Sequence, residues 1–119
     1  MAGSSRERPR PITSSPLEAP RARLLCRAET DSAAVLGAFA DVEGRADRAR
    51  AYRRMADAEN EHARRWAIRI YETSGAMPGR TPTVLARLLS ALARRFGPTS
   101  VAPVVRRLQS WHHAIAARR

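Results

Sequence analysis

The stretch FADVEGRADRARAYRRMADAENEHARRW, residues 39–66, decides the fold. Near its start, EGRAD reads as a tight turn in which Gly44 ends one helix and Asp47 is placed to cap the next. Apolar residues recur at helical spacing on both sides of that turn. We therefore predict an antiparallel helical hairpin, with one helix over about 22–43 and a second over about 46–73.

Two shorter helices are predicted downstream, over about 82–96 and 100–117. The segment TSGAMPGRTP, rich in Gly and Pro, separates them from the hairpin, and Gly97 with Pro98 separates them from each other. Pro103 is tolerated because it falls in a first turn. The expected apolar face of the third helix consists of Val84, Leu85, Leu88, Leu89, Leu92 and Phe96. The fold class is all-α, a hairpin extended to a three- or four-helix bundle.

Residues 1–21 differ from the rest in composition. They are rich in Pro, Ser and Arg and almost without large apolar side chains, so they cannot bury enough surface to offset the entropy of ordering. We expect a disordered tail over 1–21 and a single helical domain over 22–117.

The formal charge is +11, carried by 22 arginines without any lysine, and residues 73–119 hold eight arginines and no acidic residue. Such a surface attracts polyanions or an acidic partner. Because Ala is also abundant, the arginine content is equally what a coding bias would produce. Neither aromatic interleaving nor a helix-turn-helix pattern is present, so nucleic-acid binding is not favoured.

Cys26 is the only cysteine, which excludes an intrachain disulfide and a cysteine-based zinc cluster. No apolar run approaches the roughly 20 residues of a membrane-spanning helix, and the N-terminus lacks the apolar core of a secretion signal. We predict a soluble, cytoplasmic protein.

Two acids and a histidine break the apolar pattern of the hairpin. Glu59 and His62 are three residues apart and share the stripe of the second helix that carries Tyr52, Met55, Ala56, Ala63, Trp66 and Ile70. Glu29 stands in the apolar register of the first helix. Burying such groups costs several kcal/mol unless they are paired with each other, with a cation or with a metal.

The spacing of these residues about the turn is symmetric. Glu29 lies 15 residues before Gly44 and Glu59 lies 15 residues after it. At a rise of 1.5 Å per residue, both sit roughly 22 Å from the turn. The two carboxylates and the imidazole of His62 are therefore expected to meet between the helices.

Carboxylate and imidazole ligands without thiolates suit iron or manganese. A carboxylate-bridged dinuclear site takes Glu from each of two helices and Glu-x-x-His from each of two others, so this hairpin supplies half. A homodimer could supply the other half, or the fourth helix could contribute Gln109 and His112, although Gln is a poor substitute for a bridging carboxylate. The alternative is a Glu–His pair without metal, in an interaction module whose basic half meets an acidic partner or nucleic acid.

The segments ETDSAAVL and FADVEGRADRARAYRRMADAENEHARRW, followed by LLSALARRFGPTSVAPVVRRLQ, resemble the rubrerythrin/ferritin-like domain fused to bacterial relatives of the vacuolar iron transporter. The resemblance implies a ferritin-like fold, with iron bound by Glu29, Glu59 and His62 and oxidised or sensed for export. It also implies a membrane transporter partner, because the membrane part is absent from this chain. Gln109 stands where that family would have its next ligand Glu. Enzymatic activity, of the ferroxidase kind, is expected only if a dinuclear site is completed.

Overall fold

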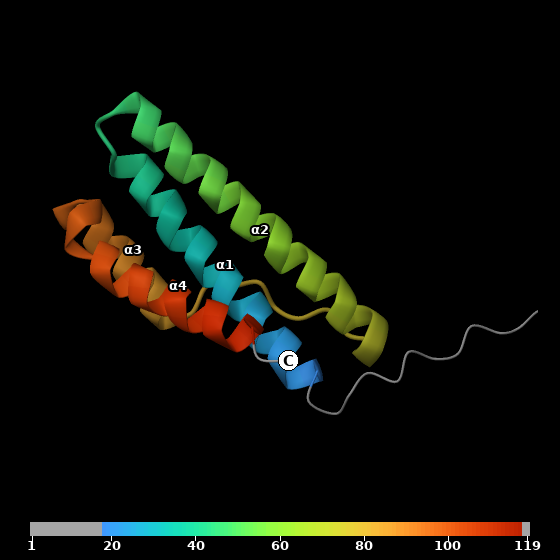
Figure 1. Ribbon diagram of the computed structural model, residues 1–119. Coiled ribbons are helices and arrows are strands. Elements are labelled where there is room, and N and C mark those ends of the chain that lie inside the picture. Colours follow the sequence, from blue (N-terminus) through green and yellow to red (C-terminus); the bar gives the residue numbers. More distant parts are fainter. Residues whose placement is uncertain (1–17, 118–119) are drawn as a thin grey trace, which may run out of the picture.

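The computed structural model describes residues 18–117, with Glu18 and residues 108–109, 111–113 and 115–117 described by backbone alone. These residues form four α-helices: α1 (Glu18–Val42), α2 (Ala46–Ser74), α3 (Val84–Phe96) and α4 (Ala102–Ala117), with a short 3-10 helix, η1 (Pro98–Ser100), before α4 (Figure 1). The same residues contain no β-strand. The all-α prediction is confirmed. Residues 1–17 of the tail predicted over 1–21 lie outside the described residues, and residues 18–21 are helical.

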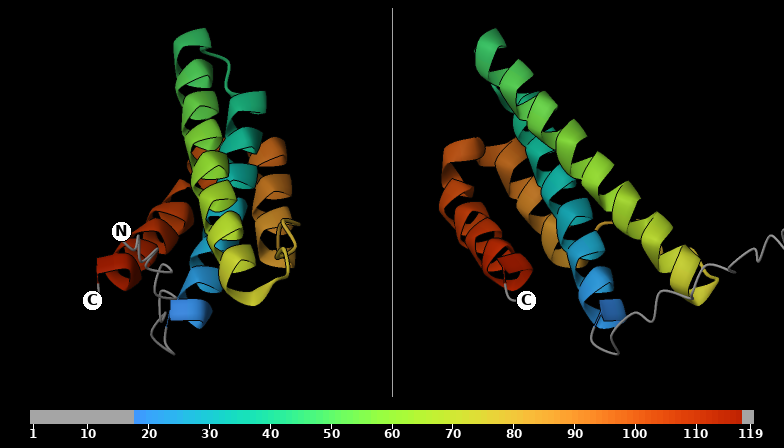
Figure 2. Two further views of the ribbon diagram at one scale, coloured as in Figure 1. Left: turned by 90° about the vertical axis from the view of Figure 1, so that its right-hand side faces the viewer. Right: turned by 45° about the vertical axis from the view of Figure 1, so that its right-hand side comes forward.

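Helices α1 and α2 form the predicted antiparallel hairpin and lie side by side along their length (Figures 1 and 2). Helix α1 begins at Glu18, so the domain boundary expected at residue 22 falls inside it. Pro20 lies in the first turn of α1, where the missing N–H costs no intrahelical hydrogen bond.

The predicted cap at Asp47 is wrong. The N-cap of α2 is Arg45, which makes no side-chain capping bond, and Asp47 lies in the first helical turn. There its carboxylate accepts a hydrogen bond of 3.3 Å from the Arg45 guanidinium. A negative charge in the first turn still complements the helix dipole, so Asp47 supports the helix start without capping it.

Helix α3 buries a different face from the predicted one. Its buried residues are Ala86, Leu89, Ser90 and Ala93, whereas Leu85 and Leu88 are about half exposed and Phe96 is 63% exposed. Small residues let the helix approach α1 closely, and Ser90 can be buried because its hydroxyl donates to the Ala86 carbonyl at 2.8 Å. Apolar residues surround much of α3, so periodicity alone does not select the buried face.

The hairpin is packed by two apolar clusters, and the small buried residues Ala28, Ala33 and Ala63 lie between them along the chain. One cluster lies toward the turn and includes Val35, Leu36 and Phe39 of α1, packed with α3 and α4. The other lies at the far end and consists of Ala22, Cys26, Ala67 and Ile70, with Trp66 against it. Glu29, Glu59 and His62 occupy the levels between these clusters along the chain.

Alanines form most of the buried surface of α2. Ala56, Ala63 and Ala67 are all 5% exposed or less, and we call this row the alanine seam. The Cys26 thiol on α1 donates a hydrogen bond of 3.5 Å to the Ala63 carbonyl, which shows how closely the two helices approach. Burial is the main cause that raises the pKa of this thiol, so Cys26 acts as a small apolar residue.

The connection from α2 to α3 is tied back to the hairpin at two points. Asp31 of α1 accepts hydrogen bonds from the backbone N–H of Thr83 at 2.8 Å and from its hydroxyl at 2.6 Å. Thr83 is itself the N-cap of α3. Arg80 donates to the Asn60 carbonyl of α2 at 3.0 Å. These contacts hold α3 against α1.

Within the described residues, none of the helices is long and apolar enough to cross a bilayer.

Candidate metal centre

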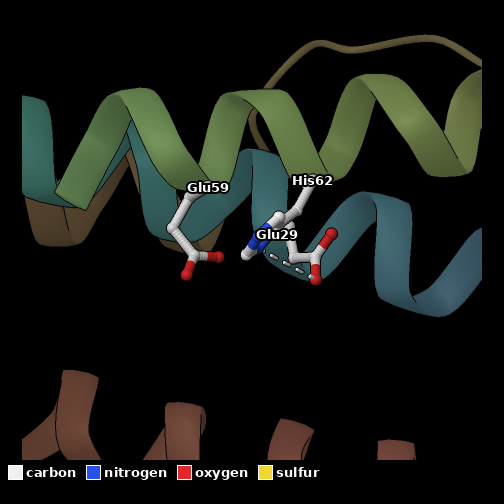
Figure 3. Close-up of side chains that lie close together, drawn as sticks. All are labelled: Glu29, Glu59 and His62. Carbon is white, nitrogen blue, oxygen red and sulfur yellow. Dashed lines mark ion pairs between the residues drawn. The ribbon is translucent and has the colours of Figure 1, made fainter. Parts of the chain in front are cut away.

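The hairpin brings Glu29, Glu59 and His62 together, as their spacing about Gly44 predicts. Glu29 projects from α1, while Glu59 and His62 project from α2 one turn apart (Figure 3). Each residue offers a ligand atom, and these atoms all lie within 4.8 Å of one another. Two carboxylates and an imidazole at that separation could hold a single metal ion after small side-chain adjustments.

Glu29 is the most buried of the three. Its side chain is 20% exposed and its Oε1 lies 4.0 Å from Nδ1 of His62. The other oxygen, Oε2, is buried and finds no hydrogen-bond partner within the described part of the chain. A buried carboxylate oxygen without a well-formed hydrogen bond is costly, and the nearby Trp66 indole, which lowers the pKa of Glu29, offsets only part of the effect of burial.

The surroundings of Glu29 also disfavour its ionised form and so raise its pKa. Burial, as the largest cause, and the neighbouring Glu59 carboxylate raise the pKa of Glu29 from 4.5 to about 6, against the opposing influence of His62 and of the Trp66 indole. Two carboxylates placed together in a partly desolvated site repel each other when both are ionised. A divalent cation between them would remove both penalties.

His62 is more exposed than the sequence pattern indicates. The pattern places it on the inward stripe of α2, but its side chain is half exposed, and Met55 of the same stripe is 46% exposed. The inward assignment is therefore wrong for Met55 and only partly right for His62. The physical reason is that α1 is the main neighbour of α2 among the described helices, and a helix with one main neighbour buries a narrower stripe than a helix inside a full bundle.

Two of the three residues, Glu29 and His62, border a pocket that also contains two arginines. The pocket has a volume of about 380 Å³ and is lined by Glu29, His62, Arg65, Trp66 and Arg69. Arg69 lies over the indole ring of Trp66, with its guanidinium carbon 5.7 Å from the ring centroid. The sequence pattern places Trp66 on the stripe of His62 but does not single out Arg65 or Arg69. The spacing of these arginines, three and seven residues after His62, is the signal that they share its face.

Neither arginine neutralises Glu29. Arg65 is instead 3.6 Å from a carboxylate oxygen of Glu61, a residue that pairs mainly with Arg64 at 2.8 Å. Among the described residues, the ion pair within 4.0 Å that Glu29 makes is the one with His62. The carboxylate therefore stays available to a cation entering the pocket.

Helix α4 runs on the side of the hairpin toward which the three side chains point (Figure 3). Gln109 and His112, which the sequence offers as further ligands, belong to this helix. Their side chains lie outside the described residues. The backbone thus places the fourth helix opposite the cluster without deciding whether it contributes a ligand.

The arrangement supports a metal site of hard and borderline donors. Carboxylate oxygens and imidazole nitrogens suit iron, manganese and zinc, and the lack of thiolate at the cluster gives no preference for softer ions. Comparison of the sequence with family models, with curated proteins and with solved structures finds no match.

Proposed function

We propose that this protein binds iron or manganese through Glu29, Glu59 and His62, as a ferritin-like carboxylate and histidine site. The observation that carries the proposal is the meeting of three ligand atoms within 4.8 Å around a carboxylate whose buried Oε2 makes no well-formed hydrogen bond with a described residue. Buried polar groups that lack hydrogen bonds occur mainly at functional sites, where a ligand offsets the free energy lost on burial.

Each residue has a distinct part in this proposal. The carboxylates of Glu29 and Glu59 would supply negative charge and bridge or chelate the cation, while His62 would be a neutral terminal ligand. When iron is bound, the site supplies a redox-active ion. The ferritin-like assignment and ferrous oxidation depend on a second set of ligands, because three donors from one hairpin make half of a dinuclear carboxylate site.

A homodimer is our proposed source of that second half, and α4 of the same chain is the competing source. Sedimentation velocity with and without metal distinguishes them, together with the substitution His112→Ala. Completion by a homodimer predicts that metal promotes dimer formation and that His112→Ala leaves binding unchanged. Completion by α4 predicts binding by a monomer that loses affinity on His112→Ala. The proposed transporter partner would be tested separately, after metal binding is established.

The decisive experiment is an anaerobic ferrous titration of the purified protein, alongside the variants Glu59→Ala and Glu61→Ala. Glu61 is a matched control because it lies two residues from Glu59 on the same helix and pairs with Arg64 on the surface. We expect binding near one iron per chain that Glu59→Ala removes and Glu61→Ala preserves. Binding below about 0.2 iron per chain, or equal binding by all three proteins, would refute the proposal.

The alternative function, an interaction module with a metal-free Glu–His pair, is supported by the 4.0 Å contact between Glu29 and His62. That contact would stabilise the protein without any ion. The same titration decides between the two functions, since the alternative predicts no stoichiometric binding and no change in thermal stability on adding Fe²⁺ or Mn²⁺.

A further inference from the structure

Helix α3 leaves large apolar side chains in solvent. Val84 is 79% exposed, Leu85 and Leu88 are 52% and 55% exposed, and Phe96 is 63% exposed. We call these four residues the α3 stripe. In the described part of the chain, α3 packs against α1 and contacts η1, and these contacts leave the four side chains of the stripe largely uncovered. A row of exposed leucines and phenylalanine along a well-formed helix marks an interaction surface.

The stripe is continuous with a pocket. A hollow of about 350 Å³ opens between α1, α3 and the start of α4, and its lining includes Leu24, Val35, Leu85 and Leu89. Leu85 belongs both to the stripe and to the pocket wall. The pocket is mostly apolar and large enough to accept a side chain of leucine or phenylalanine size, so the surface offers an anchor point as well as a flat contact.

Positive charges outnumber negative ones around the stripe. Arg87, Arg94 and Arg95 are exposed on α3 itself, and Arg27 lines the pocket. Residues 73–119 contain no acidic residue. Two acids of α1 lie nearby: Asp31 lines the pocket and accepts hydrogen bonds from Thr83, and Asp41 pairs with Arg53 and Arg94. Arg27 and Arg87 make no ion pair with any described residue.

Four kinds of partner could cover the stripe, and the charge pattern distinguishes between them. A second copy docked stripe to stripe would bring the α3 arginines of both chains together in a region where arginines outnumber acids, at a cost that opposes association. Nucleic acid would satisfy the arginines but would not bury the leucines. A flat anionic bilayer could satisfy both, but it has no projection to fill the recess beside Leu85. An amphipathic helix with acidic flanks fits the apolar row, the recess and the arginines together.

We propose that the α3 stripe and its pocket form a docking site for an acidic amphipathic helix of another protein, which places one apolar side chain in the pocket beside Leu85. The site is separate from Glu29, Glu59 and His62, so it operates with or without bound metal. The surrounding arginines accelerate encounter and select acidic partners, while the apolar contact provides affinity.

The test uses the full chain and a synthetic peptide as the probe. The peptide is a labelled helix with leucines at i, i+3, i+7 spacing and glutamates on its flanks, and a matched peptide carries lysines in place of the glutamates. Binding is followed by fluorescence anisotropy. The protein variants are Leu88→Ser and, as the control, Met77→Ser, because Met77 is 57% exposed, nearly the same as Leu88, but lies outside the stripe.

We expect the acidic peptide to bind at least tenfold more tightly than the lysine peptide. Leu88→Ser should weaken binding about fivefold, as expected for losing the contact of a half-exposed leucine, and Met77→Ser should change it less than twofold. Both variants alter exposed residues, so circular dichroism should be unchanged.

Three outcomes would overturn the proposal. The first is no preference for the acidic peptide, or equal binding by Leu88→Ser and wild type. The second is a wild-type dimer that Leu88→Ser dissociates in sedimentation velocity, which would assign the stripe to a second copy. The third is Leu88-dependent binding to vesicles containing about 30% phosphatidylserine without peptide binding, which would assign it to a lipid surface.

Discussion

Replacing Glu29 by glutamine should stabilise the metal-free protein at neutral pH while abolishing metal binding. The pKa of Glu29 in the folded protein is raised from 4.5 to about 6, so folding favours the neutral acid. Each pKa unit corresponds to about 1.4 kcal/mol, and ionising Glu29 in the folded protein above pH 6 therefore costs roughly 2 kcal/mol of stability. Glutamine has nearly the same shape and never pays this cost.

The sign of the effect follows from proton binding. Because its folded pKa lies above the unfolded value, Glu29 contributes stability that is fully present below pH 4.5 and is lost as pH rises through about 6. We expect Glu29→Gln to gain about 1–2 kcal/mol over wild type at pH 7, after allowance for partial exposure, and to gain almost nothing near pH 4.5.

Urea unfolding in the presence of a chelator measures this difference, with Glu61→Gln as the control. Glu61 is exposed and its pKa is lowered by the hydrogen bond from Arg64, so its replacement should not stabilise the protein. Adding Mn²⁺ should then stabilise wild type and leave Glu29→Gln unchanged. If Glu29→Gln is less stable than wild type at pH 7, the carboxylate is satisfied in the apo protein and the reasoning fails.

Three further predictions concern the site and its scaffold. Metal affinity should fall as pH drops below about 6, approaching tenfold per unit, because the proton on Glu29 then competes with the ion; a pH series of Mn²⁺ titrations checks this, and a flat profile would exclude Glu29 as a ligand. Asp31→Ala should cost about 1–2 kcal/mol in urea unfolding, since Thr83 loses both of its hydrogen bonds to α1; an unchanged midpoint would show that the α3 connection does not depend on them. Leu89→Ala should cost about 2–4 kcal/mol, whereas Leu88→Ala should change stability by less than about 0.5 kcal/mol, because Leu89 is 6% exposed and Leu88 is 55% exposed; equal losses would contradict the assigned orientation of α3.

The hairpin and the meeting of its polar residues follow from local sequence. Gly44 with its neighbours marks a turn, helical periodicity extends on both sides, and equal distances from the turn put Glu29 and Glu59 at one height. These inferences need only the helical rise and an antiparallel return, and the structure bears them out. The same counting indicates neither how deeply each side chain is buried nor whether a metal is bound.

The orientation of α3 and the exposure of His62 depend on long-range packing. Ala86, Ser90 and Ala93 form the contact with α1 because small residues allow close approach, while the larger Leu85 and Leu88 remain outside. A hydrophobic pattern ranks leucine above alanine and so favours a face that shares Leu89 with the buried one but is turned toward Leu85 and Leu88. Likewise, the width of the buried stripe on α2 depends on how many helices pack against it. That number is a property of the whole fold, so the exposure of His62 cannot be predicted from the helical pattern alone.

The alanine seam sets the distance between α1 and α2. Ala63, fully buried, lies one residue after His62, and an alanine has no rotamer with which to take up slack between two backbones. The distance between the two helices is thus constrained. An ion in the proposed site must fit the space that the side chains of Glu29, Glu59 and His62 can span at that distance. The residue at position 63 can therefore influence which ions fit the proposed site without contacting them, because it sets the distance between the two helices that carry Glu29, Glu59 and His62.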